Sequence, residues 1–82
     1  MKWFSTSIWV KREEMNVLPL ETVEEAMRFL DEWPAGRRTP LYYVAVNSLQ
    51  EAAKGTISPG KARAAVVTFL KDTDNLAEDT ID

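Results

Sequence analysis

Apolar and polar positions alternate along the first part of the chain, in residues 3–11. One side of this stretch carries Phe4, Thr6, Ile8 and Val10. The opposite side carries two tryptophans, Trp3 and Trp9. A repeat of two residues with many aromatic and β-branched side chains is typical of a β-strand, which the pattern therefore predicts here.

A second short apolar run follows a charged segment. Residues 11–15 are mostly charged and indicate a turn, whereas residues 16–20 again have the composition of a strand. Pro19 has no N–H to donate to a ladder, so this second strand is expected at an edge. The two runs together predict an antiparallel β-hairpin.

Three amphipathic helices are predicted after the hairpin. Thr22 and Glu25 have the spacing of a capping box, in which the hydroxyl accepts from the third helical N–H and the carboxylate reaches back to the N–H of the cap residue. The first helix therefore begins after Thr22, and it ends before Pro34 because a proline disfavours helical geometry in the residue that precedes it. Its apolar positions are Val23, Ala26, Met27, Leu30 and Trp33, with Phe29 beside them.

The second and third helices each begin with a hydroxyl residue that is followed by proline. Thr39 and Ser58 are the expected caps, because proline sacrifices no hydrogen bond at the first helical position. Gly55 is expected to end the second helix by taking the left-handed conformation, and the third helix is expected to fray near Asp72. The apolar stripe predicted for the second helix consists of Leu41, Val44, Ala45, Ser48, Leu49 and Ala52.

The order of the elements predicts an α+β fold, in which an N-terminal two-stranded antiparallel β-hairpin is followed by three α-helices (ββααα). Strands and helices that are segregated in this way usually place the helices on one face of the sheet. Residues 1–71 are expected to form a single domain, since a chain of 82 residues is too short for a second core. Residues 72–82 hold five acidic and no basic side chains and are expected to form a flexible tail.

The composition narrows the chemistry that is open to the chain. Histidine and cysteine are both absent, which removes the commonest general base, the commonest transition-metal ligand and the thiolate nucleophile. The paired carboxylates are sequence neighbours that point apart, which does not suit acid–base catalysis. We therefore expect no catalytic residue, no metal site, no cofactor and no enzymatic role. The chain also has no signal-peptide pattern and no run of about 20 apolar residues, which indicates a cytoplasmic protein without membrane contact.

Several short motifs along the chain resemble one known family. They are Trp3, Ile8-Trp9-Val10, Val23-Glu24-Glu25-Ala26, Leu30, Trp33-Pro34, Gly55, Ser58-Pro59 and Ala62-Arg63-Ala64-Ala65. In these motifs the chain resembles domain of unknown function family 982, a family of short bacterial proteins, over about residues 3–70. The end of the first helix and the segment 55–63 are its most specific parts. The resemblance supports the α+β fold and implies no catalytic residues, because the family has no assigned activity.

Four basic residues are candidates for contact with an anion or a nucleic acid. Arg37 and Arg38 precede the second helix, and Lys61 and Arg63 begin the third, so a helical hairpin could gather some of them in the manner of a helix-turn-helix. Residues 1–71, however, hold ten basic and eight acidic side chains, a balance too close to neutral to indicate a nucleic-acid partner. Nucleic-acid binding is therefore the alternative hypothesis, and a small enzyme is the third.

Trp3 and Trp9 are the main candidates for an interaction surface. If the helices cover the side of the hairpin that carries Phe4, both indoles are left in or near solvent, where exposed aromatic groups often mark a contact with a partner. The alternative is that the sheet twists enough to place one of the two indoles under the end of a helix. The leading hypothesis is a small non-catalytic module for protein–protein interaction or self-association. Its partner is then an unknown protein or a second copy of the chain, which would pair through the tryptophan side or the edge of the hairpin.

Overall fold

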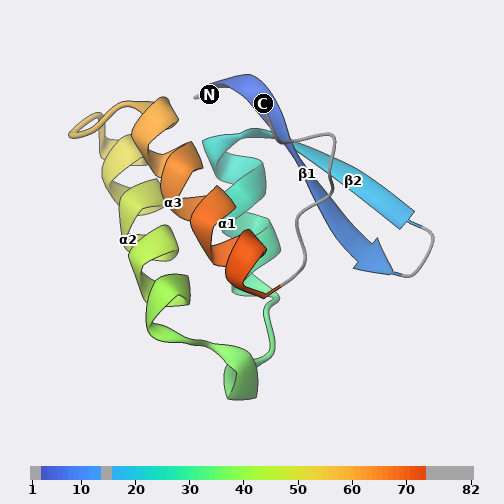
Figure 1. Ribbon diagram of the computed structural model, residues 1–82. Coiled ribbons are helices and arrows are strands. Elements are labelled where there is room, and N and C mark those ends of the chain that lie inside the picture. Colours follow the sequence, from blue (N-terminus) through green and yellow to red (C-terminus); the bar gives the residue numbers. More distant parts are fainter. Residues whose placement is uncertain (1–2, 14–15, 74–82) are drawn as a thin grey trace.

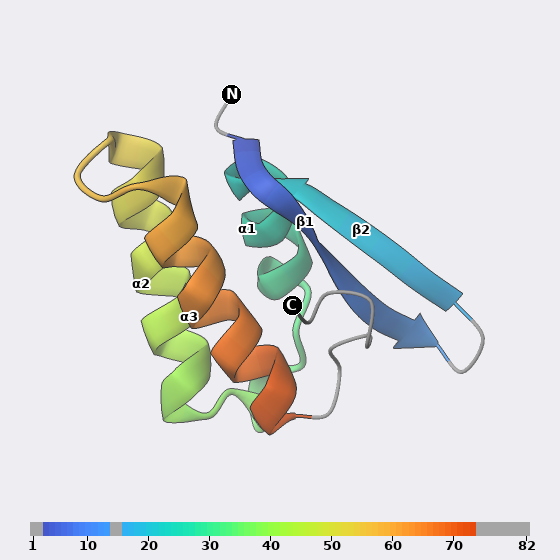
Figure 2. The same cartoon turned by 45° about the horizontal axis from the view of Figure 1, so that its top comes forward.

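The computed structural model describes residues 3–13 and 16–73, in which two strands pack against three helices (Figure 1). The elements are β1 (Trp3–Glu13), β2 (Asn16–Thr22), α1 (Val23–Asp31), a short 3-10 helix η1 (Ala35–Arg37), α2 (Pro40–Lys54) and α3 (Pro59–Asp72). In the described residues β1 and β2 form one antiparallel sheet, and the helices lie together on one side of it (Figures 1 and 2). The predicted α+β class with three helices is confirmed.

Parts of two predicted segments lie outside the described residues. These parts are residues 14–15 of the charged turn and residues 74–82 of the acidic tail. Asp72, which was expected to begin the tail, is instead the last residue of α3. Both strands are longer than predicted, because β1 continues to Glu13 and β2 continues to Thr22.

The register of the sheet decides which side chains reach the core. Ile8 lies opposite Leu20, and both are buried. The pairing is irregular between Trp3 and Ile8, so the simple alternation is interrupted there. Thr6 was predicted on the inner side but is exposed. A shift in register changes the direction in which the neighbouring side chains point, which accounts for the difference.

The caps of the helices agree with the prediction at two of three positions. Thr22 Oγ1 accepts from the N–H of Glu25 at 3.1 Å, and Ser58 Oγ accepts from the N–H of Lys61 at 3.3 Å. Thr39 precedes α2 without a capping hydrogen bond from its side chain, so the prediction was wrong at this site. Gly55 has a φ of 87° and ends α2 in the left-handed conformation, as expected.

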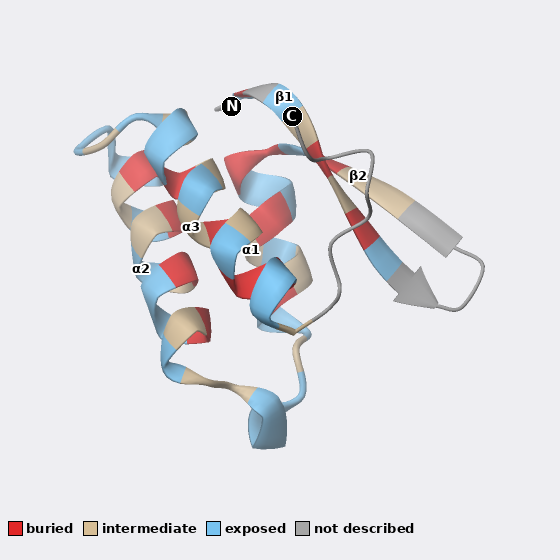
Figure 3. Cartoon of the chain, viewed as in Figure 1, coloured by how far each residue is buried: buried red, intermediate tan, exposed pale blue. Residues whose placement is uncertain are grey.

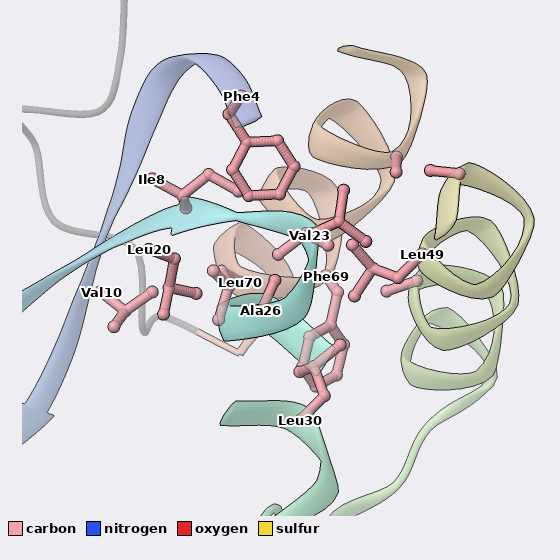
Figure 4. Packing of buried hydrophobic residues seen from close by; sticks show 14 of the residues in the cluster. Phe4, Ile8, Val10, Leu20, Val23, Ala26, Leu30, Leu49, Phe69 and Leu70 are labelled. Carbon is pink, nitrogen blue, oxygen red and sulfur yellow. The ribbon is translucent and has the colours of Figure 1, made fainter. Parts of the chain in front are cut away.

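All five regular elements contribute side chains to one core, which lies between the sheet and the helices (Figures 3 and 4). Phe4, Ile8 and Val10 come from β1, and Leu30 and Phe69 come from two of the helices. Phe69 is completely buried, with its ring 5.0 Å from that of Trp33 and 5.7 Å from that of Tyr42. Aromatic rings at these separations add to the stabilisation that burial itself provides.

The buried stripe of α2 differs from the predicted one. Tyr42 is buried and Val44 is 53% exposed, so the helix is rotated from the orientation that the apolar pattern suggested. The hydroxyl of Tyr42 donates to the carbonyl oxygen of Leu30 at 2.8 Å, which removes the cost of burying that group. The larger ring of Tyr42 therefore takes the core position, and Val44 remains in solvent.

Candidate functional site

The two tryptophans of the hairpin lie on the face of the sheet that points away from the helices. Trp3 is next to buried Phe4, and Trp9 lies between buried Ile8 and Val10, so local alternation directs each indole outward on its own side of the irregular segment. Trp3 is 61% exposed, whereas Trp9 is half-buried and lies opposite Pro19 in the register. We call Trp3, Trp9 and Pro19 the tryptophan face.

The outer edge of β2 offers few donors to another strand. Pro19, which lies opposite Trp9, has no N–H to donate to a neighbouring strand. The N–H of Glu21, two residues further on, donates to Glu25 Oε1 at 2.7 Å. The capping box therefore differs from the prediction, since the carboxylate reaches Glu21 instead of the cap residue. A proline and an occupied N–H make this edge a poor template for strand addition.

Arg38 serves the fold at the end of α1. Its Nη2 and Nε donate to the carbonyl oxygen of Trp33 at 3.1 Å and 3.3 Å, and Nη2 also lies 3.4 Å from the carbonyl oxygen of Asp31. The guanidinium carbon is 4.9 Å from the centre of the Tyr42 ring. Arg38 thus stabilises the C-terminus of α1, where carbonyl groups and the helix dipole favour a cation. Its neighbour Arg37 is exposed.

Arg63 joins α3 to β1. Its Nε donates to the carbonyl oxygen of Thr6 at 2.8 Å, and its Nη2 lies 3.5 Å from the carbonyl oxygen of Ser7. Both carbonyls belong to the segment in which the pairing of β1 with β2 is irregular, so the guanidinium supplies donors there. Lys61, one half-turn earlier on α3, is exposed.

The four basic candidates are not gathered into one patch. Arg37 and Arg38 lie at the beginning of α2, and Lys61 and Arg63 lie at the beginning of α3. The two helices run antiparallel and side by side, so these beginnings are at opposite ends of the helical pair (Figures 1 and 2). A helix-turn-helix motif instead crosses its helices at a steep angle.

A hollow between β2 and α1 has a volume of about 210 Å³. Its apolar lining is formed by Leu18, Pro19, Leu20 and Phe29, and its charged lining by Glu25, Arg28 and Glu32. The carboxylate of Glu25 already accepts from Glu21, which leaves it less available for a ligand. Within residues 3–13 and 16–73 there is no group of three or more acidic side chains arranged to hold a metal ion, and no helix long and apolar enough to cross a membrane.

A second exposed aromatic surface lies on α2 and was missed by the sequence prediction. Tyr43 is 57% exposed and Val44 is 53% exposed. The ring of Tyr43 stands edge-on against that of Tyr42, with 5.1 Å between their centres. One signal in the sequence could have revealed this surface: α2 carries no charged residue from Pro40 to Gln50, although 28% of the chain is charged.

Comparison with known families identifies one match. The family model described as "Protein of unknown function (DUF982)" matches residues 8–76, which confirms the resemblance noted in the sequence. Searches of curated proteins and of solved structures find no significant match.

Proposed function

Because the chain belongs to the DUF982 family, whose function is unknown, we propose that it is a non-catalytic interaction module that binds another protein through its tryptophan face. The observation that carries this proposal is the exposure of Trp3, 61% of whose surface is open to solvent at the beginning of β1. Tryptophan is one of the three side chains that are enriched among the residues that contribute most to binding at protein interfaces.

The tryptophan face combines a large exposed side chain, Trp3, with a strand whose backbone is held in place by the core. Trp3 is flanked by buried Phe4, and Trp9 is half-buried against the sheet, so the strand beneath the face is fixed by the core. A fixed backbone reduces the conformational entropy that binding must remove. A tryptophan that leaves water completely buries roughly 200 Å² and contributes correspondingly to affinity.

The tryptophan face is better suited to bind a partner protein than the outer edge of β2. Strand addition needs a row of free N–H and C=O groups, and on β2 this row contains Pro19 and the N–H of Glu21 that Glu25 already occupies. We therefore propose recognition by side chains, with the indole of Trp3 inserted into a pocket of the partner.

Photo-crosslinking tests this proposal in cells that express the chain. A benzophenone amino acid at position 3 should give a defined adduct with one partner, and the same group at the exposed α3 position Thr68 should not. With the partner identified and purified, calorimetry should show that Trp3→Ala weakens binding about 10- to 30-fold. Tyr43→Ala is the matched control, since it removes an exposed ring from a different surface and should leave the affinity unchanged. Equal affinity of wild type and Trp3→Ala would exclude this face.

Nucleic-acid binding remains the alternative, and we expect it to fail. Arg38 and Arg63 use their guanidinium groups on backbone carbonyls, and the remaining pair, Arg37 and Lys61, lies at opposite ends of the helical hairpin. A mobility-shift assay with short DNA and RNA duplexes should show no shift even at about 50 mM salt, where phosphate contacts are strongest. A shift that disappears in the double variant Arg37→Gln, Lys61→Gln would instead support it.

A further inference from the structure

An uncharged stripe runs along the outer side of α2. Tyr43, Val46, Asn47 and Gln50 follow the spacing i, i+3, i+4, i+7, which places them on one side of the helix. Tyr43, Asn47 and Gln50 are exposed, and Val46 is half-buried. Protein interfaces are depleted in charged residues and enriched in tyrosine. We call these four residues the α2 stripe.

A small pocket borders the α2 stripe, in the groove between α1 and α2. It has a volume of about 100 Å³ and is lined by Met27, Asp31, Tyr42, Val46 and Gln50. Met27, Val46 and the ring of Tyr42 provide apolar walls, while Asp31 provides a carboxylate that accepts hydrogen bonds. Such a pocket suits an aromatic ring that ends in a hydroxyl donor.

We propose that the α2 stripe binds a second copy of this chain, with each Tyr43 inserted into the other copy's pocket. Two α2 helices packed antiparallel about a two-fold axis between Val46 and Asn47 bring Tyr43 of one copy opposite Gln50 of the other. Gln50 lines the pocket, so the ring of Tyr43 from one copy lies at the opening of the other copy's pocket. Its phenol hydroxyl can then donate to the carboxylate of Asp31 in that pocket. Antiparallel helices also align their dipoles favourably.

Self-association is favoured over a different partner because the ring and the pocket belong to the same surface. A two-fold contact is self-complementary, so each copy must offer both the inserted group and its receptor, as the α2 stripe does. The four residues of the stripe carry no charge, so two paired stripes do not repel one another, and the carboxylate of Asp31 lies in the pocket beside the stripe, where it can accept the tyrosine hydroxyl. Glu51 and Lys54, further along α2, form an ion pair with 3.7 Å between Glu51 Oε2 and Lys54 Nζ, so their charges offset each other. The contact involves little more than one helical face, at the small end of interface sizes, so we expect a weak dimer that forms at high concentration.

Sedimentation equilibrium of the pure full-length chain tests the proposal. The wild type should approach twice the monomer mass as its concentration rises to the millimolar range. Tyr43→Ala and, independently, Gln50→Arg should weaken dimerisation at least about 10-fold, while Tyr43→Phe, which keeps the ring, should weaken it less. Both residues changed, Tyr43 and Gln50, are exposed in the monomer, and circular dichroism should confirm that the three variants fold.

Two outcomes would overturn the proposal. A wild type that stays monomeric over the whole range would exclude a dimer, and a Tyr43→Ala variant that dimerises as strongly as the wild type would exclude this surface. Trp3→Ala should dimerise normally, because the α2 stripe and the tryptophan face are separate. A dimer lost in Trp3→Ala but retained in Tyr43→Ala would place the self-contact on the tryptophan face, so failures of the two proposals are distinguishable.

Discussion

Replacing Phe69 with alanine should lower the free energy of unfolding by about 3–5 kcal/mol, the largest effect that we expect from a single substitution. The side chain is completely buried, and its ring meets those of Trp33 and Tyr42 edge-on. Removing it leaves a cavity where α1, α2 and α3 meet. Because a chain of this size usually has a stability of about 5 kcal/mol, the variant should retain at most about 2 kcal/mol and be only marginally stable at room temperature.

Urea denaturation followed by circular dichroism measures this loss. Phe69→Leu, which keeps most of the volume, should lose about 1–1.5 kcal/mol. The neighbouring substitution Thr68→Ala, at an exposed position, should change the free energy of unfolding by less than about 0.5 kcal/mol. If Phe69→Ala lowered the free energy of unfolding by less than Phe69→Leu does, the ring of Phe69 would not lie at the centre of the core.

Replacing Arg63 with glutamine should lower the free energy of unfolding by about 1–2 kcal/mol. The guanidinium donates at 2.8 Å to the carbonyl oxygen of Thr6, in a segment where the ladder between the strands is irregular. A hydrogen bond from a charged donor contributes more than a neutral one, but partial exposure of Arg63 reduces the contribution.

Lys61→Gln is the matched control for Arg63, because it removes the same charge from an exposed position on the same helix. It should leave the free energy of unfolding within about 0.5 kcal/mol of the wild-type value. Equal losses for the two variants would mean that net charge, and not the link between α3 and β1, accounts for the effect. Hydrogen exchange of the β1 amides should accelerate in Arg63→Gln alone.

The sequence predicted those features of the fold that depend on neighbouring residues. The alternation in β1, the proline and hydroxyl signals at the helix starts, and Gly55 all act over a few positions, and the structure contains the corresponding elements. The choice between Tyr42 and Val44 for the core was wrong because it depends on a distant group. The carbonyl of Leu30 receives the hydroxyl of Tyr42, and no periodicity in α2 reveals that partner.

In the candidate site, too, features set by neighbouring residues could be predicted from the sequence and features set by distant residues could not. Exposure of Trp3 is one of the two outcomes that the pattern of β1 allowed, whereas the structural roles of Arg38 and Arg63 were not predicted. Arg63 contacts Thr6, which lies far away in the sequence, in a segment whose irregular pairing no local pattern announces. The apolar pattern of α2 placed Val44 in the core and so did not predict that Val44 and its neighbour Tyr43 are both exposed.

The most direct test of the interaction proposal follows the three indole N–H resonances of ¹⁵N-labelled protein as the crosslinked partner is added. Trp33 is an internal reference, because its Nε1 donates to the carbonyl oxygen of Arg37 at 3.2 Å and its ring packs on Phe69. We predict that the indole resonance of Trp3 shifts strongly on complex formation, and that the resonance of Trp33 keeps its position. A shift of Trp33 with an unchanged Trp3 would contradict the account, because the partner would then bind elsewhere.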